Sequence, residues 1–451
     1  MAKREERSIL CFVGRTNTGK SSLLNVLSGQ KDFAIVDPTP GTTADTVVTH
    51  MEIHGIGPCK VMDTAGIDER SALGKKKRRK TFEAMEEADL NIIVVDLARA
   101  AHTRDIALER SLLEKASQDG KQALLLYNVF RKKVKDDEAV ERCRAAVDLA
   151  LGGRVPGILV DASDPKEQAV LAGFIRTFFR RESREIDLLP GLKSTGFVLL
   201  IIPMDEETPT LRLLRPQDMA VERILRKFAI PVLFRLNLAK ARSSAAREVR
   251  EERKRYEGLL RHLRESPEGM QLVVTDSQAF DIVAHWTPKE HALTSFSIMM
   301  TNYMSFGNLG LFVEGVGAVD RLRPGDKVLI VEACNHSRQC DDLGTVQIPR
   351  RLERHVGGTL DFRFSFGRTY PEDLTGIRLI VHCGACMIDR QKYLRRILKA
   401  REAGIAFTNY GILLSYLQGK EVLKRTVRPF LTHTTSPSER CLVQSRSTVA
   451  R

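Results

Sequence analysis

The sequence predicts an α/β protein built from three domains. Short apolar runs typical of buried strands alternate with segments of helical periodicity along most of the chain. One such run, 8–13, leads into a glycine-rich phosphate-binding motif, and two others, 328–331 and 377–381, each lead into cysteine and histidine residues. We expect a phosphate-binding-loop domain, a small α/β connector and an α/β metal-site domain, followed by a disordered tail. The expected boundaries are 1–185, 186–270, 271–425 and 426–451.

The composition is that of an ordinary water-soluble globular protein. Of the 451 residues, 43% are hydrophobic and 28% are charged. No apolar run reaches the length of a membrane span, and the first residues are too charged for a secretory signal, so we expect a cytoplasmic protein. The eight cysteines do not form the pattern of a disulfide framework. The net charge of +14 permits binding to nucleic acid or to an acidic partner but identifies neither.

The first domain begins with a phosphate-binding loop in its required context. Strand 8–13 precedes Gly14-Arg-Thr-Asn17-Thr18-Gly19-Lys20-Ser21, and helical periodicity over 23–27 follows. Glycines let the backbone amides wrap around phosphates, and the helix N-terminus faces their negative charge. Lys20 is expected to reach the β- and γ-phosphates, and Ser21 to ligate magnesium. The candidate phosphate-binding residues are Gly14, Asn17, Thr18, Gly19, Lys20, Ser21 and Ser22.

Two further motifs are typical of a hydrolysis-driven switch. Pro40-Gly-Thr-Thr-Ala-Asp45 supplies a threonine hydroxyl that can close over magnesium, and Asp63-Thr-Ala-Gly66 follows a strand. Asp63 can hold the metal through water, and the Gly66 amide can sense the γ-phosphate. Together with the phosphate-binding loop, these motifs resemble those of the TrmE/Era branch of translation-factor-like GTPases.

The resemblance implies a GTPase with GTP and Mg²⁺ as its ligands. Thr43 would be the magnesium-linked threonine, so the catalytic candidates are Lys20, Thr43, Asp63 and Gly66. Ile67 stands where some GTPases carry a water-orienting glutamine, and an isoleucine cannot orient water. Families of this kind use a K⁺ ion, held by the loop asparagine, in place of an arginine finger. With Asn17 at that position, slow hydrolysis stimulated by potassium is expected.

The base-reading loop departs from the GTPase pattern. Strand 124–127 ends at the expected Asn128, but Val129-Phe130-Arg131 follows instead of Lys-x-Asp. The usual carboxylate accepts hydrogen bonds from guanine, whereas the Arg131 guanidinium has no acceptor to offer. Asp161-Ala162-Ser163 resembles the second base-contacting loop, so Ala162 joins Asn128 as a candidate base contact. We therefore expect phosphate binding with a weakened preference for guanine.

The connector is predicted to contain too few helices and strands to cover its own sheet. It contains two strands, 196–202 and 230–234, a helix over 217–228 and a highly charged helix over 243–265. Such a unit leaves a sheet edge and a face uncovered, and sharing the sheet with a second copy would close it. A homodimer is therefore expected. The alternative is that the connector packs against its neighbours in the same chain.

The third domain carries the most specific constellation of the chain. Cys334-Asn-His336 and His382-Cys383-Gly-Ala-Cys386 each follow a buried-strand pattern, and open α/β sheets bind ligands at such strand ends. Thiolates suit zinc or an iron–sulfur cluster, and imidazole can complete either site. The alternative is a set of buried cysteines that act as small apolar side chains.

At this point the chain resembles the HydF family of GTPases, which mature di-iron hydrogenases, over residues from about 8 to 420. In addition to the switch motifs, the resemblance rests on 274–280, 293–298, 332–336, 381–387 and 408–411. It implies a scaffold that holds a 4Fe–4S cluster, assembles a di-iron subcluster precursor on it and transfers the precursor to apo FeFe-hydrogenase. The radical enzymes HydE and HydG would be further partners.

The resemblance assigns the cluster ligands to Cys334, Cys383 and Cys386. Three cysteines leave one iron with a replaceable ligand, as a docking scaffold needs. His336 or His382 could supply a weak fourth ligand to the cluster. Each could instead orient one of the metal ligands without binding the metal itself. The rival prediction is a TrmE/Era-like GTPase that acts on RNA and carries a structural zinc site. We do not expect nucleic-acid binding, because the aromatic and basic patterns of most nucleic-acid folds are missing from the sequence.

Overall fold

The computed structural model describes residues 7–30, 47–67, 72–130, 136–180, 186–204, 213–333, 342–367 and 369–431. These residues form two compact units that divide at 183/184. The predicted α/β class is confirmed in both units. Among the described residues, no helix is long and apolar enough to cross a membrane.

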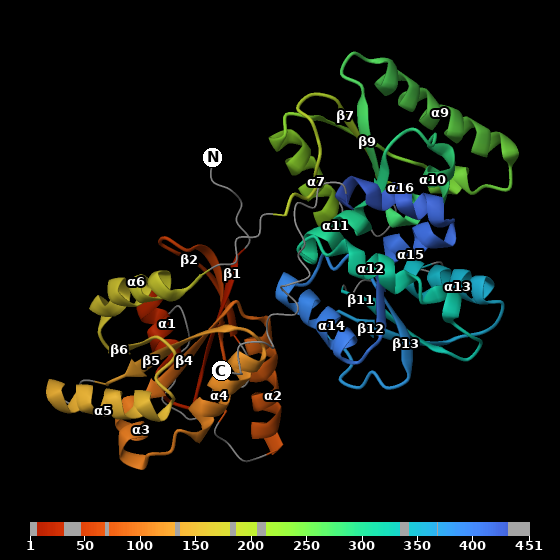
Figure 1. Cartoon of the computed structure of the whole chain (residues 1–451). Coiled ribbons are helices and arrows are strands. Elements are labelled where there is room, and N and C mark those ends of the chain that lie inside the picture. The colour runs from red at the N-terminus through yellow and green to blue at the C-terminus, as the bar shows by residue number, and fades with distance from the viewer. Residues whose placement is uncertain are drawn as a thin grey trace. The chain divides into compact units, whose positions relative to one another are not determined.

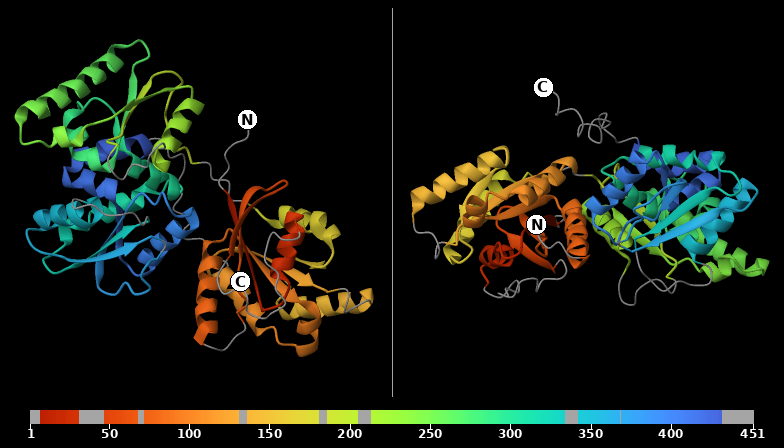
Figure 2. Two further views of the ribbon diagram at one scale, coloured as in Figure 1. Left: turned by 180° about the vertical axis from the view of Figure 1, so that it is seen from behind. Right: turned by 90° about the horizontal axis from the view of Figure 1, so that it is seen from below.

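The first unit is a six-stranded sheet covered by helices on both faces (Figures 1 and 2). The strand order is β2-β3-β1-β4-β5-β6, and all neighbours are parallel except β2 and β3. The strands are β1 (Ser8–Gly14), β2 (Val47–Ile53), β3 (Gly57–Asp63), β4 (Leu90–Asp96), β5 (Gln122–Asn128) and β6 (Gly157–Val160). The helices are α1 (Lys20–Ser28), α2 (Ala72–Glu87), α3 (Leu97–Thr103), α4 (Ala107–Gln118), α5 (Asp137–Ala150) and α6 (Gln168–Phe178).

Two apolar clusters lie on opposite faces of this sheet. Side chains of α1 and α6 fill one cluster, and side chains of α2 to α5 fill the other. Every residue of β1 is buried, as expected for a central parallel strand covered on both faces. The carboxyl ends of β1 and β3 consequently lie side by side, with Phe12 opposite Asp63, and this register brings the switch motif to the phosphate-binding loop.

The second unit contains two parallel four-stranded sheets. The first has the order β10-β9-β7-β8. Its strands are β7 (Phe197–Ile201), β8 (Ile230–Phe234), β9 (Met270–Thr275) and β10 (Leu293–Ser295). Its helices are α7 (Arg215–Arg226), α8 (Leu238–Ala241), α9 (Ala246–Glu265) and α10 (Phe280–Trp286). Because β9 pairs along the whole of β7, the boundary expected at 270/271 passes through this sheet.

The second sheet has the order β12-β11-β13-β14. Its strands are β11 (Lys327–Glu332), β12 (Asp361–Phe366), β13 (Ile377–His382) and β14 (Ala406–Asn409). The remaining helices are α11 (Phe296–Met304), α12 (Leu309–Val316), α13 (Ile348–Val356), α14 (Arg390–Glu402), α15 (Tyr410–Leu417) and α16 (Lys420–Leu431). Short helical turns are η1 (Pro165–Glu167), η2 (Ser277–Ala279), η3 (Val319–Arg321) and η4 (Leu343–Gln347). One apolar core contains residues of both sheets, among them Val198 and Val381.

Two local differences from the expected elements have clear causes. The short apolar run 293–298 has the pattern of a single strand, but Ser295 ends β10 and caps α11 by accepting the N–H of Ile298 at 3.2 Å. The tail was expected to begin at 426, yet α16 continues to 431. Val427 and Phe430 are buried in the core at helical spacing, and this burial keeps the segment helical.

Candidate functional sites

The phosphate-binding loop connects β1 to α1 through residues in left-handed conformations. Gly19 has a φ of +93° and Asn17 a φ of +60°. The Lys20 ammonium donates to the carbonyl of Arg15 at 2.7 Å and to that of Gly14 at 3.4 Å. The Thr18 hydroxyl also donates to the Arg15 carbonyl, at 3.0 Å. The Lys20 ammonium is therefore held by carbonyl groups of the loop, and phosphate oxygens of a bound nucleotide can replace these carbonyl partners.

The two candidate magnesium residues of the described chain lie together. The Ser21 hydroxyl donates to Oδ2 of Asp63 at 2.5 Å. Burial raises the pKa of Asp63, while the Ser21 hydrogen bond and the Lys20 charge act in the opposite direction. Oδ1 of Asp63 is buried without a hydrogen-bond partner among the described residues, so it fits the hydrogen bond to a magnesium-bound water that the sequence predicted. Thr43 lies outside the described residues.

The Asp-Thr-Ala-Gly segment packs directly on the phosphate-binding loop. A Cβ added to Gly66 would lie 2.2 Å from Oγ1 and 2.4 Å from N of Thr16, so only glycine permits this approach. Ile67, the next residue, is buried in the apolar cluster beneath α2. The contact between Gly66 and Thr16 thus connects the switch segment directly to the phosphate-binding loop.

Asn128 joins three loops of the nucleotide site. It is fully buried, donates through Nδ2 to the Thr18 carbonyl at 2.9 Å and accepts the N–H of Ala162 at 3.0 Å. A Cβ on Gly19 would lie 2.3 Å from Nδ2 of Asn128, so the final loop glycine makes room for this side chain. Arg131 lies outside the described residues.

Sequence reasoning missed one buried ion pair at this site. Nε of Arg15 lies 2.7 Å from Oε1 of Glu109, and both side chains are buried. Asp105 lies 3.1 Å from Nη2 of the same arginine. The pair fixes the start of the phosphate-binding loop to α4. No sequence signal could have revealed it, because the two residues are 94 positions apart and follow no motif.

The cysteine site forms where β11 and β13 end. The N–H of Cys383 donates to the Val331 carbonyl at 2.9 Å, and the N–H of Ala333 lies 3.1 Å from the Cys383 sulfur. The residue immediately before Cys334 therefore touches the first cysteine of the Cys-x-x-Cys turn. Ala385 completes this turn with a φ of +57°.

Burial dominates the electrostatic setting of the two described cysteines. Burial, and secondarily the neighbouring Cys386, raises the pKa of Cys383 to about 12, although hydrogen bonds from Ala333 and Ala385 act against this. Burial also raises the pKa of Cys386. Such thiols lose their protons to a bound cation rather than to water, and main-chain N–H donors to sulfur are usual around iron–sulfur clusters. The two described thiols and the N–H donors around them fit part of the implied 4Fe–4S site.

Two of the predicted ligands, Cys334 and His336, lie outside the described residues, as does Cys340, a further cysteine six positions after Cys334. Within the described part of the chain, no group of three or more histidine, cysteine, aspartate or glutamate side chains is arranged around a metal position.

His382 is held behind the cysteine turn. Its ring is fully buried, Nδ1 is 2.8 Å from the Cys383 carbonyl, and Nε2 accepts from Nη1 of Arg396 at 2.9 Å. Burial and the Arg396 charge lower the pKa of His382 to about 3, so the imidazole is neutral. Both ring nitrogens are therefore engaged. Of the two roles predicted for His382, this geometry fits the orientation of a ligand rather than metal coordination.

Arginines from two directions surround the cysteine turn. Nη1 of Arg215, the first residue of α7, donates to the Cys386 carbonyl at 2.6 Å. The Arg390 guanidinium lies 4.3 Å and 4.4 Å from the ring centres of Tyr303 and Phe306. The first contact ties the turn to α7 and places the Arg215 charge near Cys386, and the second ties the start of α14 to Tyr303 of α11.

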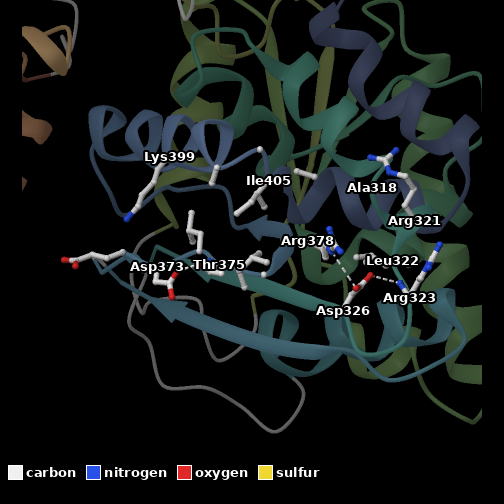
Figure 3. Close-up of a pocket in the computed structure, with 17 residues that line it drawn as sticks. Ala318, Arg321, Leu322, Arg323, Asp326, Asp373, Thr375, Arg378, Lys399 and Ile405 are labelled. Carbon is white, nitrogen blue, oxygen red and sulfur yellow. Dashed lines mark hydrogen bonds and ion pairs between the residues drawn. The ribbon is translucent and has the colours of Figure 1, made fainter.

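A separate cavity of about 930 Å³ opens at the other end of this sheet (Figure 3). Its lining includes Asp326 before β11, Arg378 on β13 and Ala406 on β14, all near the amino ends of the strands. Arg378 is paired with Asp326 at 3.8 Å. The cavity is thus distinct from the cysteine site at the carboxyl ends.

Three family models match successive parts of the chain. A model described as 50S ribosome-binding GTPase matches residues 9–129. The Hydrogen maturase F dimerization domain matches residues 188–304, and the Hydrogen maturase F tetramerization domain matches 310–429. The dimerization match contains β9 and β10, in agreement with the observed sheet.

The curated relatives match the first unit. The tRNA modification GTPase MnmE of Acetivibrio thermocellus is 46% identical over 95 residues, which are 21% of this chain and 20% of that protein. MnmE of Heliobacterium modesticaldum is 37% identical over 154 residues, 34% of this chain and 30% of that protein. The GTPase Der of Prochlorococcus marinus is 32% identical over 142 residues, 31% and 30% of the two chains. The chain thus spans less than a third of the length of these relatives.

Among solved structures, Aquifex aeolicus Era bound to GDP and aluminium fluoride is 17% identical, with a TM-score of 0.35, and covers 51% of this chain and 93% of its own. The bacterial selenocysteine-specific elongation factor gives a TM-score of 0.31 at 15% identity, over 41% of this chain and 31% of its own.

The family assignment rests on the domain models. The two hydrogen maturase F models together match more than half of the chain, and the GTPase model matches the part that precedes them. The chain belongs to the HydF family of hydrogenase-maturation GTPases.

Proposed function

We propose that this protein is a GTP-hydrolysing scaffold that carries a 4Fe–4S cluster and delivers a di-iron subcluster precursor to apo FeFe-hydrogenase. Cys334, Cys383 and Cys386 hold the cluster. The observation that supports the proposal is the hydrogen bond from the N–H of Ala333, the residue before Cys334, to the Cys383 sulfur at 3.1 Å. A cluster held by three thiolates supplies one iron with an exchangeable ligand, suited to docking and release.

The residues around the cysteines shape and support that site. His382 orients the Cys383 carbonyl, and Arg396 keeps the imidazole neutral and fixed. Arg215 holds the Cys386 carbonyl from α7. The positive charge of Arg215 near Cys386 favours an anionic cargo. HydE and HydG are the proposed sources of the precursor, and the cytoplasm is the proposed location.

The nucleotide site works as a switch with Mg²⁺. Lys20 binds the β- and γ-phosphates, Ser21 ligates the ion, and Asp63 holds it through water. Thr43 closes over the ion from the first switch segment. Asn17 is an exposed residue of the loop, and it holds K⁺ in place of an arginine finger.

The nucleotide signal passes through the contact between the loop and the switch segment. Gly66 lies against Thr16, so a γ-phosphate that attracts the Gly66 amide also displaces this packing. Hydrolysis is slow because Ile67 is buried and cannot orient water. Base recognition uses Asn128 and the Ala162 N–H, without the carboxylate that usually faces guanine.

Self-association is supported by the dimerization and tetramerization models. We place the homodimer contact on β8, which is an edge of its sheet. Ile230 is 40% exposed and Leu233 48% exposed on this strand, and Phe228 just before it is 81% exposed. A second copy that adds its β8 to this edge would cover these side chains and pair the free main-chain groups.

Metal analysis of anaerobically purified full-length protein tests the proposal. About four irons and four sulfides per chain and a brown colour are expected for a 4Fe–4S cluster. Cys383→Ser should lose this iron, whereas Cys143→Ser, in α5 of the first unit, is the matched control and should retain it. Colourless protein with one zinc per chain would refute the scaffold and support the RNA-directed alternative. Lys20→Ala should abolish GTP hydrolysis without loss of iron.

A further inference from the structure

The guanidinium of Arg15 is held from two sides by acidic residues far along the chain. Nε of Arg15 lies 2.7 Å from Oε1 of Glu109 and Nη2 lies 3.3 Å from Oε2, so the fork of the guanidinium faces both oxygens of one carboxylate. Nη2 also lies 3.1 Å from Oδ2 of Asp105 and donates to the Asp105 carbonyl at 3.3 Å. Arg15 is only 8% exposed and Glu109 1% exposed. A planar group bound in this way has one orientation, which fixes the residue that carries it.

The carbonyl of Arg15 holds two polar side chains of the phosphate-binding loop. It accepts from the Lys20 ammonium at 2.7 Å and from the Thr18 hydroxyl at 3.0 Å. The Gly14 carbonyl is the more distant partner of the same ammonium, at 3.4 Å. Both Lys20 and Thr18 are buried, so they depend on the protein rather than on bulk water for their hydrogen bonds. The place of the ammonium therefore depends on the place of the Arg15 carbonyl.

A gain in stability does not by itself account for this ion pair. Apolar residues of similar volume often stabilise a protein as well as a buried ion pair does, because desolvation offsets the attraction between the charges. Arg99 of α3 also balances the acidic groups, since Nη1 lies 4.0 Å from Oε1 of Glu109 and Nη2 lies 3.6 Å from Oδ2 of Asp105. Arg15 differs from Arg99 in that its own main chain is part of the nucleotide site.

We propose that Arg15 is a positioning residue for nucleotide binding. Its ion pair with Glu109 holds the Arg15 carbonyl, and this carbonyl holds the Lys20 ammonium in place before a nucleotide arrives. The phosphates then meet a lysine that is already ordered, so less free energy is lost on binding. A bound phosphate holds the ammonium afterwards, so the ion pair affects binding and not the hydrolysis step. The inference rests on the proposed role of Lys20 and extends it to the side chains of Arg15 and Glu109.

Nucleotide titration and steady-state kinetics of the full-length chain test this role. Glu109→Gln keeps the shape of the side chain and removes its charge. It should raise the Kd for GDP and the KM for GTP about tenfold, as expected for a misplaced binding group, while kcat keeps the wild-type value. Glu114→Gln, at an exposed position of the same helix, is the matched control and should leave all of these constants unchanged. A fall in kcat or an unchanged Kd in Glu109→Gln overturns the proposal.

A double-mutant cycle tests whether the effect passes through Lys20. In the Lys20→Ala background, Glu109→Gln should change the Kd for GDP by less than about twofold. Full additivity overturns the proposal, because the ion pair would then act on another part of the site. Unchanged GDP binding in Lys20→Ala alone would contradict the proposed role of Lys20 itself. Weakened binding in Lys20→Ala together with wild-type binding in Glu109→Gln refutes only the role of the ion pair.

A variant that lacks both charges separates positioning from folding. Arg15→Met/Glu109→Met should keep the wild-type midpoint of thermal unfolding, because apolar side chains can replace a buried ion pair without loss of stability. It should still bind GDP about as weakly as Glu109→Gln, since flexible methionines impose no single orientation on residue 15. Wild-type affinity in this double variant overturns the proposal. Unfolding of both Glu109→Gln and the double variant assigns the pair a purely structural role and overturns it as well.

Discussion

Replacement of Arg396 by methionine should destabilise the cysteine domain strongly. The buried guanidinium donates to Nε2 of His382 at 2.9 Å, to the Gly367 carbonyl at 2.8 Å and to the Thr369 carbonyl at 3.1 Å. Methionine fills similar volume but removes this donor from all three acceptors. The Thr369 carbonyl keeps a hydrogen bond from the Ser365 hydroxyl at 3.0 Å, so Nε2 of His382 and the Gly367 carbonyl are the two buried acceptors that lose a donor. At about 1–3 kcal/mol for each unsatisfied buried acceptor, we expect a loss of roughly 2–6 kcal/mol, a large part of the stability of a typical domain.

Urea denaturation of the metal-free full-length chain measures this loss. Arg401→Met, an exposed position near the end of the same helix, is the control and should change stability by no more than about 0.5 kcal/mol. Arg396→Met should also retain less iron after reconstitution, because His382 no longer holds the Cys383 carbonyl in place. If the two variants match in both measurements, Arg396 does not support the cysteine turn and the role assigned to His382 is wrong.

Gly19→Ala should weaken GDP binding about tenfold or more, since the new Cβ would lie 2.3 Å from Asn128 at a φ that costs L-residues roughly 1–2 kcal/mol; unchanged affinity in calorimetry would contradict this. GTP hydrolysis should be faster in K⁺ than in Na⁺, and Asn17→Ala should remove the difference; equal wild-type rates would eliminate the potassium site. Competition of GTP with ITP should show guanine selectivity lower by about 1.5–3 kcal/mol, or tenfold to a hundredfold, than in relatives with aspartate in place of Arg131. A selectivity of many thousandfold would point to a substitute carboxylate. Cys340→Ser should keep the cluster signal of the reduced protein, whose loss would make Cys340 a ligand.

Local sequence patterns were sufficient to predict the elements that carry the nucleotide motifs. The strand–loop–helix order and the positions of Asp63 at the end of β3 and Asn128 at the end of β5 all depend on short motifs with fixed geometry. The pairing of the two strands that lead into the cysteine segments was predictable for the same reason. Both segments follow apolar runs that form neighbouring parallel strands, and parallel strands end at one edge of the sheet.

Features that depend on distant contacts could not be read in this way. The run at 270–275 looks the same whether its strand joins β7 or β11, and only the folded core decides its partner. The hydrogen bond between His382 and Arg396 and the ion pair between Arg15 and Glu109 likewise need tertiary structure. Short apolar runs such as 293–298 are ambiguous between strand and helix, and a capping serine resolved this one toward helix.

The single apolar core beneath both sheets of the second unit has a thermodynamic consequence. Val198 and Leu200 of β7 belong to the same cluster as Val331 of β11 and Val381 of β13, and Arg215 connects α7 to the cysteine turn. A partner strand bound along β8 would suppress local opening of this shared core, and a metal held by the cysteines would do the same from the other sheet. Assembly and the proposed cluster loading would then be reciprocal equilibria, in which each raises the affinity for the other by the same factor.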